Sequence, residues 1–130
     1  MGLDAPQIIK KVYDATNNAL RMIGAVSLQA LISAASVAVD MSTGTIFRIV
    51  LGHNVTFTFS NPTSGQKYSF ILRQDGTGSR TVTWPANVKW GGGGTPPTLT
   101  TTATTGVDVV SMIYDGTSDV FLADKVLNFA

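Results

Sequence analysis

The chain has 130 residues and no cysteine, so it has the length of about one domain, and disulfides and thiolate metal sites are excluded. Its formal net charge is +1, so the basic surface that nucleic-acid binding requires is absent. Charged residues make up only 13%, which suits a protein that packs against other subunits.

Residues 4–23 allow more than one conformation. Asp4 as a cap and Pro6 in the first turn favour a short helix. The competing interpretation is a hairpin turning at Asn17 and Asn18, or an extended arm, and we prefer these two. A lone hairpin is marginal in water, so its apolar side chains need a partner surface. These partner-binding candidates are Ile8, Ile9, Val12, Tyr13, Leu20, Met22 and Ile23.

An uncharged stretch of 18 residues separates Arg21 from Asp40. Its length just reaches that of a membrane-spanning helix, but serines and small residues interrupt its hydrophobic character. The residues before it lack the basic character of a signal peptide. We therefore expect a buried or subunit-covered segment and no membrane partner.

From residue 36 onward, apolar and polar residues alternate with a period of two, which predicts β-strands. We expect strands near 36–41, 45–51, 55–59, 67–73, 79–84, 88–90, 98–105, 107–114 and 120–122. The apolar members of the alternation are Val37, Val39, Met41, Phe47, Ile49, Leu51, Val55, Phe57, Phe59, Tyr68, Phe70 and Leu72. The sequence thus predicts an all-β fold, an antiparallel β-sandwich of jelly-roll type over residues 34–130. Residues 1–33 would form an N-terminal arm.

Candidate catalytic residues are few. His53 is the single histidine and sits in a Gly-His-Asn turn, where an exposed, inert side chain is expected. Asp75 and Asp115 each precede a glycine, and aspartate in this position stabilises a turn by accepting hydrogen bonds from its own backbone. We favour that role over calcium binding or a pair of glycosidase carboxylates. The expectation is no enzyme activity, no metal and no cofactor.

The segment WGGGGTPP after residue 89 is rich in glycine but lacks the Gly-Lys-Thr/Ser ending and the following helix of a phosphate-binding loop. It predicts a loop that approaches other backbone or a subunit axis. Aromatic residues in sandwiches usually belong to the core, yet they also stack on ligands. The candidates for ligand or subunit contact are Tyr68, Trp90, Gly92 and Gly93, with Trp90 as the more exposed ring.

The block QDGTGSRTVTWPANVKW, followed by GTPPTLTTTA and a later YDG turn, resembles a β-domain of tailed-bacteriophage virion proteins. The resemblance covers residues 37–123, and VYDATNNALRM is similar to segments near virion-anchoring ends. The chain departs from the pattern at WGGGG, where a proline often follows the tryptophan, which leaves the shape of this loop open. The resemblance implies a structural role, commonly in trimers, without catalytic residues.

We therefore expect a virion structural protein that is made in the host cytoplasm and assembled onto the particle surface. The leading hypothesis is a capsid decoration or cement protein, a homotrimer attached to the major capsid protein through its N-terminal arm. The alternative is a tail-fibre or other tail-appendage module that binds a host receptor or carbohydrate.

Overall fold

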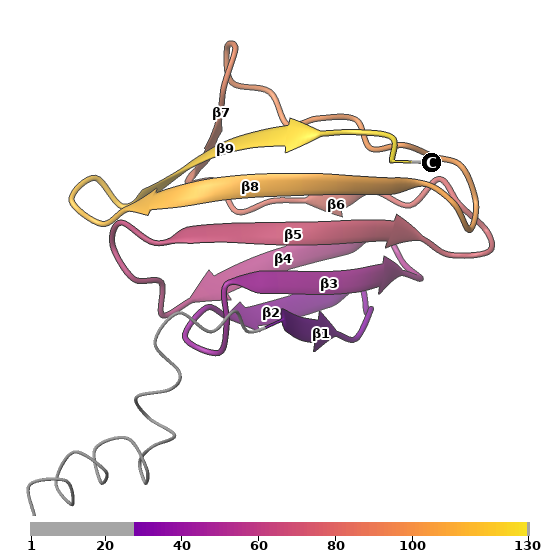
Figure 1. Ribbon diagram of the computed structural model, residues 1–130, viewed down its shortest axis with the longest axis horizontal. Coiled ribbons are helices and arrows are strands. Elements are labelled where there is room, and N and C mark those ends of the chain that lie inside the picture. The colour runs from indigo at the N-terminus through magenta and orange to yellow at the C-terminus, as the bar shows by residue number, and fades with distance from the viewer. Residues whose placement is uncertain (1–27, 130) are drawn as a thin grey trace, which may run out of the picture.

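The computed structural model describes residues 28–129, and within this range every regular element is a β-strand. The predicted all-β class is confirmed for this part of the chain. The strands in Figure 1 are β1 (Leu28–Leu31), β2 (Ser36–Asp40), β3 (Ile46–Leu51), β4 (Val55–Ser60), β5 (Lys67–Gln74), β6 (Val82–Thr83), β7 (Val88–Trp90), β8 (Val107–Asp115) and β9 (Val120–Val126).

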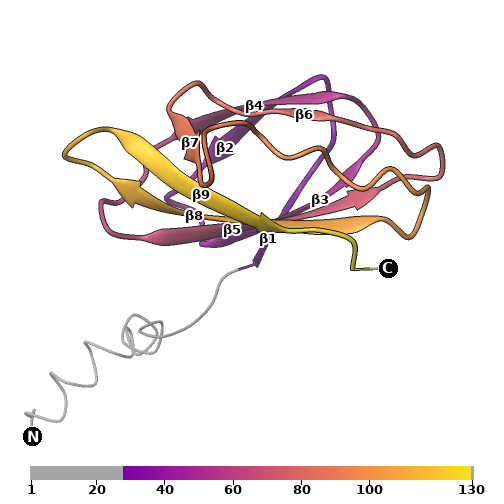
Figure 2. The same ribbon diagram turned by 90° about the horizontal axis from the view of Figure 1, so that it is seen from above.

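The strands form two sheets that face each other across the core. The larger sheet has six strands in the order β1-β3-β5-β8-β9-β7, and the smaller has three in the order β2-β4-β6. Figure 2 shows the two layers, with β4 and β6 in one and β5, β8 and β9 in the other. The domain is therefore a β-sandwich, as expected.

The first six strands alternate between the two sheets, so each turn carries the chain across the sandwich. Consequently β1, β3 and β5 are parallel neighbours, as are β2, β4 and β6. Antiparallel pairing among the described strands is confined to β5–β8 and β8–β9. The predicted antiparallel jelly roll is therefore wrong in its strand pairing. Turns such as Gly52–Asn54, which resemble hairpin turns in sequence, are corners between sheets.

The alternation with period two correctly predicts which side chains form the core. Of the predicted set, all are buried except Phe59, which is half-buried against the others. Aromatic rings fill the middle of the sandwich: Phe57 lies 5.3 Å from Trp84 and 5.4 Å from Phe70, centroid to centroid. Such rings bury large apolar areas and gain further from their tilted contacts.

Residues 98–105 form a loop, so the strand predicted there is wrong. Their backbone groups bind partners outside any strand ladder: the Thr100 N–H donates to Asp108, and the Thr101 carbonyl accepts the Ser79 N–H. The Thr104 N–H donates to the carbonyl of Asp75. A threonine-rich composition favours strands only where a neighbouring strand is available to pair.

The predicted helix, hairpin or extended arm of residues 4–23 lies outside the described residues. The boundary at residue 33 between arm and sandwich stays a prediction. Within the structure, Leu28–Leu31 already pairs with β3 as the edge strand of the larger sheet.

Candidate functional site

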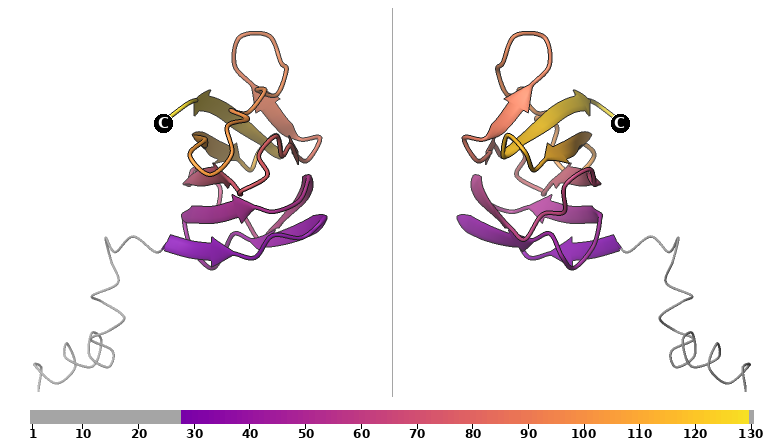
Figure 3. Two further views of the ribbon diagram at one scale, coloured as in Figure 1. Left: turned by 90° about the vertical axis from the view of Figure 1, so that its right-hand side faces the viewer. Right: turned by 90° about the vertical axis from the view of Figure 1, so that its left-hand side faces the viewer.

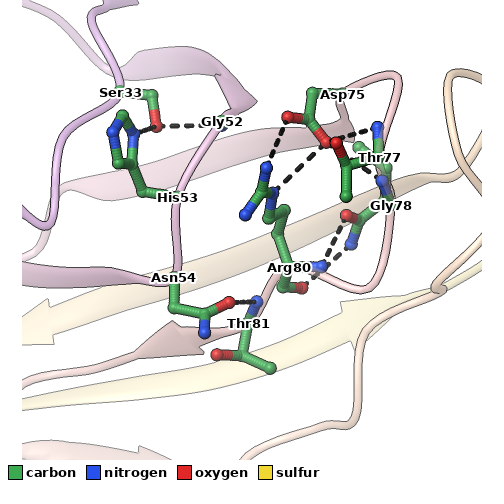
Figure 4. Close-up of polar contacts among 10 residues, drawn as sticks. Ser33, Gly52, His53, Asn54, Asp75, Thr77, Gly78, Arg80 and Thr81 are labelled. Atoms are coloured by element: carbon green, nitrogen blue, oxygen red, sulfur yellow. Dashed lines mark hydrogen bonds and ion pairs between the residues drawn. The ribbon is translucent and has the colours of Figure 1, made fainter.

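One end of the sandwich brings His53 close to a serine, which the sequence did not predict (Figure 4). Ser33 Oγ lies 3.1 Å from His53 Nδ1 and accepts a hydrogen bond of 3.0 Å from the Gly52 N–H. The serine hydroxyl is thus held between a backbone amide and the ring, and the His53 side chain is exposed. This arrangement joins the β1–β2 connection to the β3–β4 corner.

The predicted turn role of Asp75 is confirmed. Its Oδ1 accepts the N–H groups of Thr77 and Gly78, each at 3.0 Å, and its Oδ2 lies 3.0 Å from Arg80 Nη2 (Figure 4). The hydrogen bond from Arg80, assisted by Gly78, lowers the pKa of Asp75 from 3.8 to about 2. Asp115 caps its own turn in the same way, accepting the Thr117 N–H at 3.0 Å.

This pKa predicts a pH dependence. The folded state binds the Asp75 proton more weakly than the unfolded chain, so the stabilisation is present above about pH 4 and disappears as the pH falls towards 2. In Asp75→Asn, the free energy of unfolding should depend less steeply on pH across this window. Urea unfolding at several pH values measures the slope. Thr77→Ala, which keeps both the Asp75 carboxylate and the backbone N–H that it accepts, serves as the control and should keep the wild-type slope.

Two polar side chains, Gln74 and Asp108, are buried to 2% exposure at the same end of the sandwich. Gln74 Nε2 donates to the carbonyls of Arg80 and Thr100, and its Oε1 accepts the Arg80 N–H. Asp108 accepts hydrogen bonds from the Thr100 N–H and hydroxyl and from the Asn128 N–H. The sequence analysis missed both residues, although a polar residue at an inward position of an alternating strand is a usable signal.

The aromatic candidates lie deeper than expected. Tyr68 is 1% exposed and its hydroxyl accepts the Thr63 N–H, so its ring belongs to the core. Trp90 is 8% exposed and packs against Trp84 at a centroid distance of 5.5 Å, so it is less exposed than the sequence suggested. Contact of these residues with a ligand or subunit stays a prediction, and only a small part of Trp90 is reachable from outside.

The glycine candidates are exposed. Gly92 and Gly93 have φ values of 74° and 118°, a backbone region that favours glycine. A Cβ atom at either position would meet no atom within 4 Å, so open space surrounds the loop. In Figure 3 this loop projects beyond the sandwich from the end of β7. The predicted close approach to other backbone is therefore met only at the first glycine, Gly91, whose N–H donates to the Ala123 carbonyl at 3.1 Å. Gly92, Gly93 and Gly94 extend away from it.

A hollow of about 250 Å³ lies beneath the glycine loop. Its lining combines two tryptophans with prolines, a glycine and one lysine. The residues around it are Trp84, Pro85, Ala86, Val88, Lys89, Trp90, Gly94 and Pro96. Polar and apolar atoms share its lining about equally. It is smaller than the roughly 300–1,000 Å³ pockets that enclose drug-sized ligands, so its size suits a small polar group such as a single sugar ring.

Metal and membrane chemistry find no support in the described residues. Between residues 28 and 129, no three His, Asp or Glu side chains are grouped so that they could hold a metal ion. The same range contains no helix long and apolar enough to cross a membrane.

The fold and surface thus define a β-sandwich with one projecting loop and a shallow hollow, the features of a structural or binding module. The model of the family described as "Putative phage tail fibre C-terminal domain" matches residues 5–119, and the chain belongs to this family. No curated protein and no solved structure matched the chain.

The family match makes the protein a phage structural protein of the virion, as the sequence predicted. It names a tail appendage and not a head protein, so the leading hypothesis of capsid decoration is corrected in favour of the alternative. The matched range begins at residue 5 and therefore includes the segment that the sequence analysis assigned to capsid attachment.

Proposed function

We propose that the sandwich is the host-contacting module of a tail fibre and that it binds a receptor or carbohydrate through the glycine loop and the hollow beneath it. The observation that carries this proposal is the position of the loop on the fold. The chain enters the larger sheet at β1, and the loop follows β7, the strand at the opposite edge.

Five strand-to-strand steps of about 4.8 Å separate these two edges, so the loop lies roughly 24 Å from the strand where the chain enters. Figure 3 shows the loop extending further in the same direction. A tail-fibre domain that is held at its entry side would present this loop outward. Exposed loops on a rigid scaffold are common sites of recognition.

The hollow has the chemistry for a polar ligand with apolar faces, such as a sugar. Trp84 and Trp90 contribute to its lining, and so does Lys89, whose Nζ donates to the Ala86 carbonyl at 3.2 Å and supplies a cation. The two tryptophans are held by the aromatic core, so the walls are rigid before a ligand binds. Rigid walls lower the entropic cost of binding.

Filling the hollow tests the proposal. Ala86 is exposed and lines the hollow, so Ala86→Trp should block ligand entry without disturbing the core. We expect the labelled wild-type chain to bind saturably to some members of a panel of bacterial strains and surface glycans, and Ala86→Trp to weaken this binding at least tenfold.

Thr58→Trp provides the matched control, because it places the same side chain on an exposed position of β4 in the other sheet. Binding by this variant should stay within about twofold of the wild-type value. If Ala86→Trp binds as tightly as Thr58→Trp, or if the wild-type chain binds no strain and no glycan, the proposed function is wrong.

A further inference from the structure

Exposed hydrophobic side chains gather on one side of the sandwich. Among residues 28–129, seven large hydrophobic residues are exposed, and all of them lie on strands of the six-stranded sheet or within three residues of one. They are Leu28, Ile32, Val50, Ile113, Leu122, Val126 and Phe129. The side of this sheet that points away from the core is called the outer face below.

The register makes these residues part of a continuous surface. Leu28 lies beside Ile46 across β1 and β3, and Ile71 lies beside Val109, which in turn lies beside Val126. Ile46, Ile71 and Val109 are half-buried and fill the spaces between the exposed side chains. A groove of about 370 Å³, with Ile113 and Leu122 in its lining, hollows the surface near β7.

The other sheet has a different surface. The outward positions of β2, β4 and β6 carry mainly small and hydroxyl side chains: Ser36, Ala38, Asp40, Thr56, Thr58, Ser60 and Thr83. Hydroxyl side chains at the outward positions of the smaller sheet can hydrogen-bond to water. Aliphatic side chains at the outward positions of the larger sheet cannot, so their exposure to water is unfavourable. The outer face therefore has the character of a covered surface.

The outer face carries more cations than carboxylates, and a second copy of the chain can pair some of them. Arg73 and Lys89 are already engaged, since they donate to the carbonyls of Thr104 and Ala86 at 2.7 and 3.2 Å. Within the described residues, the side chains of Arg48 and Lys67 have no hydrogen-bonding or ionic partner, and no cation pairs with Asp124. A contact between identical chains can pair a carboxylate with a cation, with Asp124 of one copy next to Arg48 or Lys67 of another.

The size of the surface fits the same partner. Six strands contribute roughly twenty outward positions, close to the 20–30 residues per side of a stable protein interface. We infer that copies of this chain assemble by packing their outer faces together, with the exposed aliphatic residues at the centre of the contact. The glycine loop projects from the β7 edge and not from the outer face, so it stays accessible in such an assembly (Figure 3).

Sedimentation of the full 130-residue chain tests the inference. The wild-type chain should form an oligomer, and the sequence predicts a trimer. Ile113→Lys and Leu122→Lys replace side chains that are 49% and 55% exposed, so the fold should survive while the contact gains a buried, unpaired charge. Each variant should raise the dissociation constant at least 100-fold, and the control Thr58→Lys should change it less than threefold.

A second measurement does not depend on disruptive substitutions. The chain lacks cysteine, so one introduced thiol can be labelled specifically. In Leu122→Cys, labelling should slow at least tenfold as the protein concentration rises through the dissociation constant, whereas Thr58→Cys should label at a constant rate.

Three results would overturn the inference. The first is a wild-type chain that stays monomeric up to about 1 mM. The second is an oligomer that folded Ile113→Lys and Leu122→Lys leave intact. The third is a Leu122→Cys labelling rate that does not depend on concentration, which would show that something other than a second copy covers this face. Host binding by the glycine loop is measured separately, so either idea can fail alone.

Discussion

Replacing Gly78 by alanine is expected to destabilise the domain by about 3 kcal/mol or more. A Cβ atom at this position would lie 2.6 Å from the Thr101 carbonyl oxygen and 2.9 Å from the Ala103 nitrogen. Both are backbone atoms, which cannot move aside as a flexible side chain can. The φ value of 76° adds strain for any residue other than glycine.

Gly76 provides a matched control, because it lies in the same turn and a Cβ there would meet no atom within 4 Å. Gly76→Ala should change the free energy of unfolding by less than about 0.5 kcal/mol. Urea unfolding of the two variants gives the comparison. Equal effects would mean that the close approach between the turn and residues 101–103 does not contribute to stability.

This close approach explains why the sequence has both a glycine-containing turn and a later threonine-rich segment. The turn at Asp75–Gly78 and the threonine-rich segment after Pro97 are separated by about 20 residues, yet they form one structure. The Ser79 N–H donates to the Thr101 carbonyl, and the Thr104 N–H donates to the Asp75 carbonyl. The turn and the threonine-rich segment, which both belong to the block that resembles phage virion proteins, therefore stabilise each other through backbone hydrogen bonds.

The sequence was sufficient to predict most strands and their inward residues, because a strand with one face in the core must alternate with a period of two. It missed β1, which lies in the segment assigned to the arm, and it predicted a strand over 98–105 where the structure has a loop. It was not sufficient for the pairing. The turn at Gly52–Asn54 has residues that suit a hairpin, and the same residues suit a corner between sheets. Only the contacts that β3 and β4 make with strands distant in sequence decide between them.

The candidate site was predictable to a similar degree. The run of glycines indicated an exposed loop, and Gly92 and Gly93 are exposed. Composition could not indicate that Trp90 turns inward, because a tryptophan beside glycines suits an exposed ligand-stacking surface as well as a buried core position. Its burial depends on Trp84, which directly follows β6 of the smaller sheet and packs against it. Contacts of this kind follow from the pairing, which the sequence left undetermined.

Gln74→Leu is expected to cost about 3 kcal/mol or more, since leucine fills a similar space but leaves three partly buried backbone groups without their partner. These groups are the N–H and carbonyl of Arg80 and the carbonyl of Thr100. Gln74 is 2% exposed, so water cannot easily replace the lost hydrogen bonds. Urea unfolding measures the effect, and faster hydrogen exchange at the Arg80 amide should accompany it.

Gln66→Leu separates this role from the general effect of replacing glutamine. The side chain of Gln66 makes one hydrogen bond, from Nε2 to the Lys67 carbonyl, at a solvent-accessible position. This variant should lose less than about 1 kcal/mol. If the two variants lose the same amount, the buried amide is not what holds the turn and the threonine-rich segment together. The close approach at Gly78 would then have to do so alone, and Gly78→Ala would remain severe while Gln74→Leu would not.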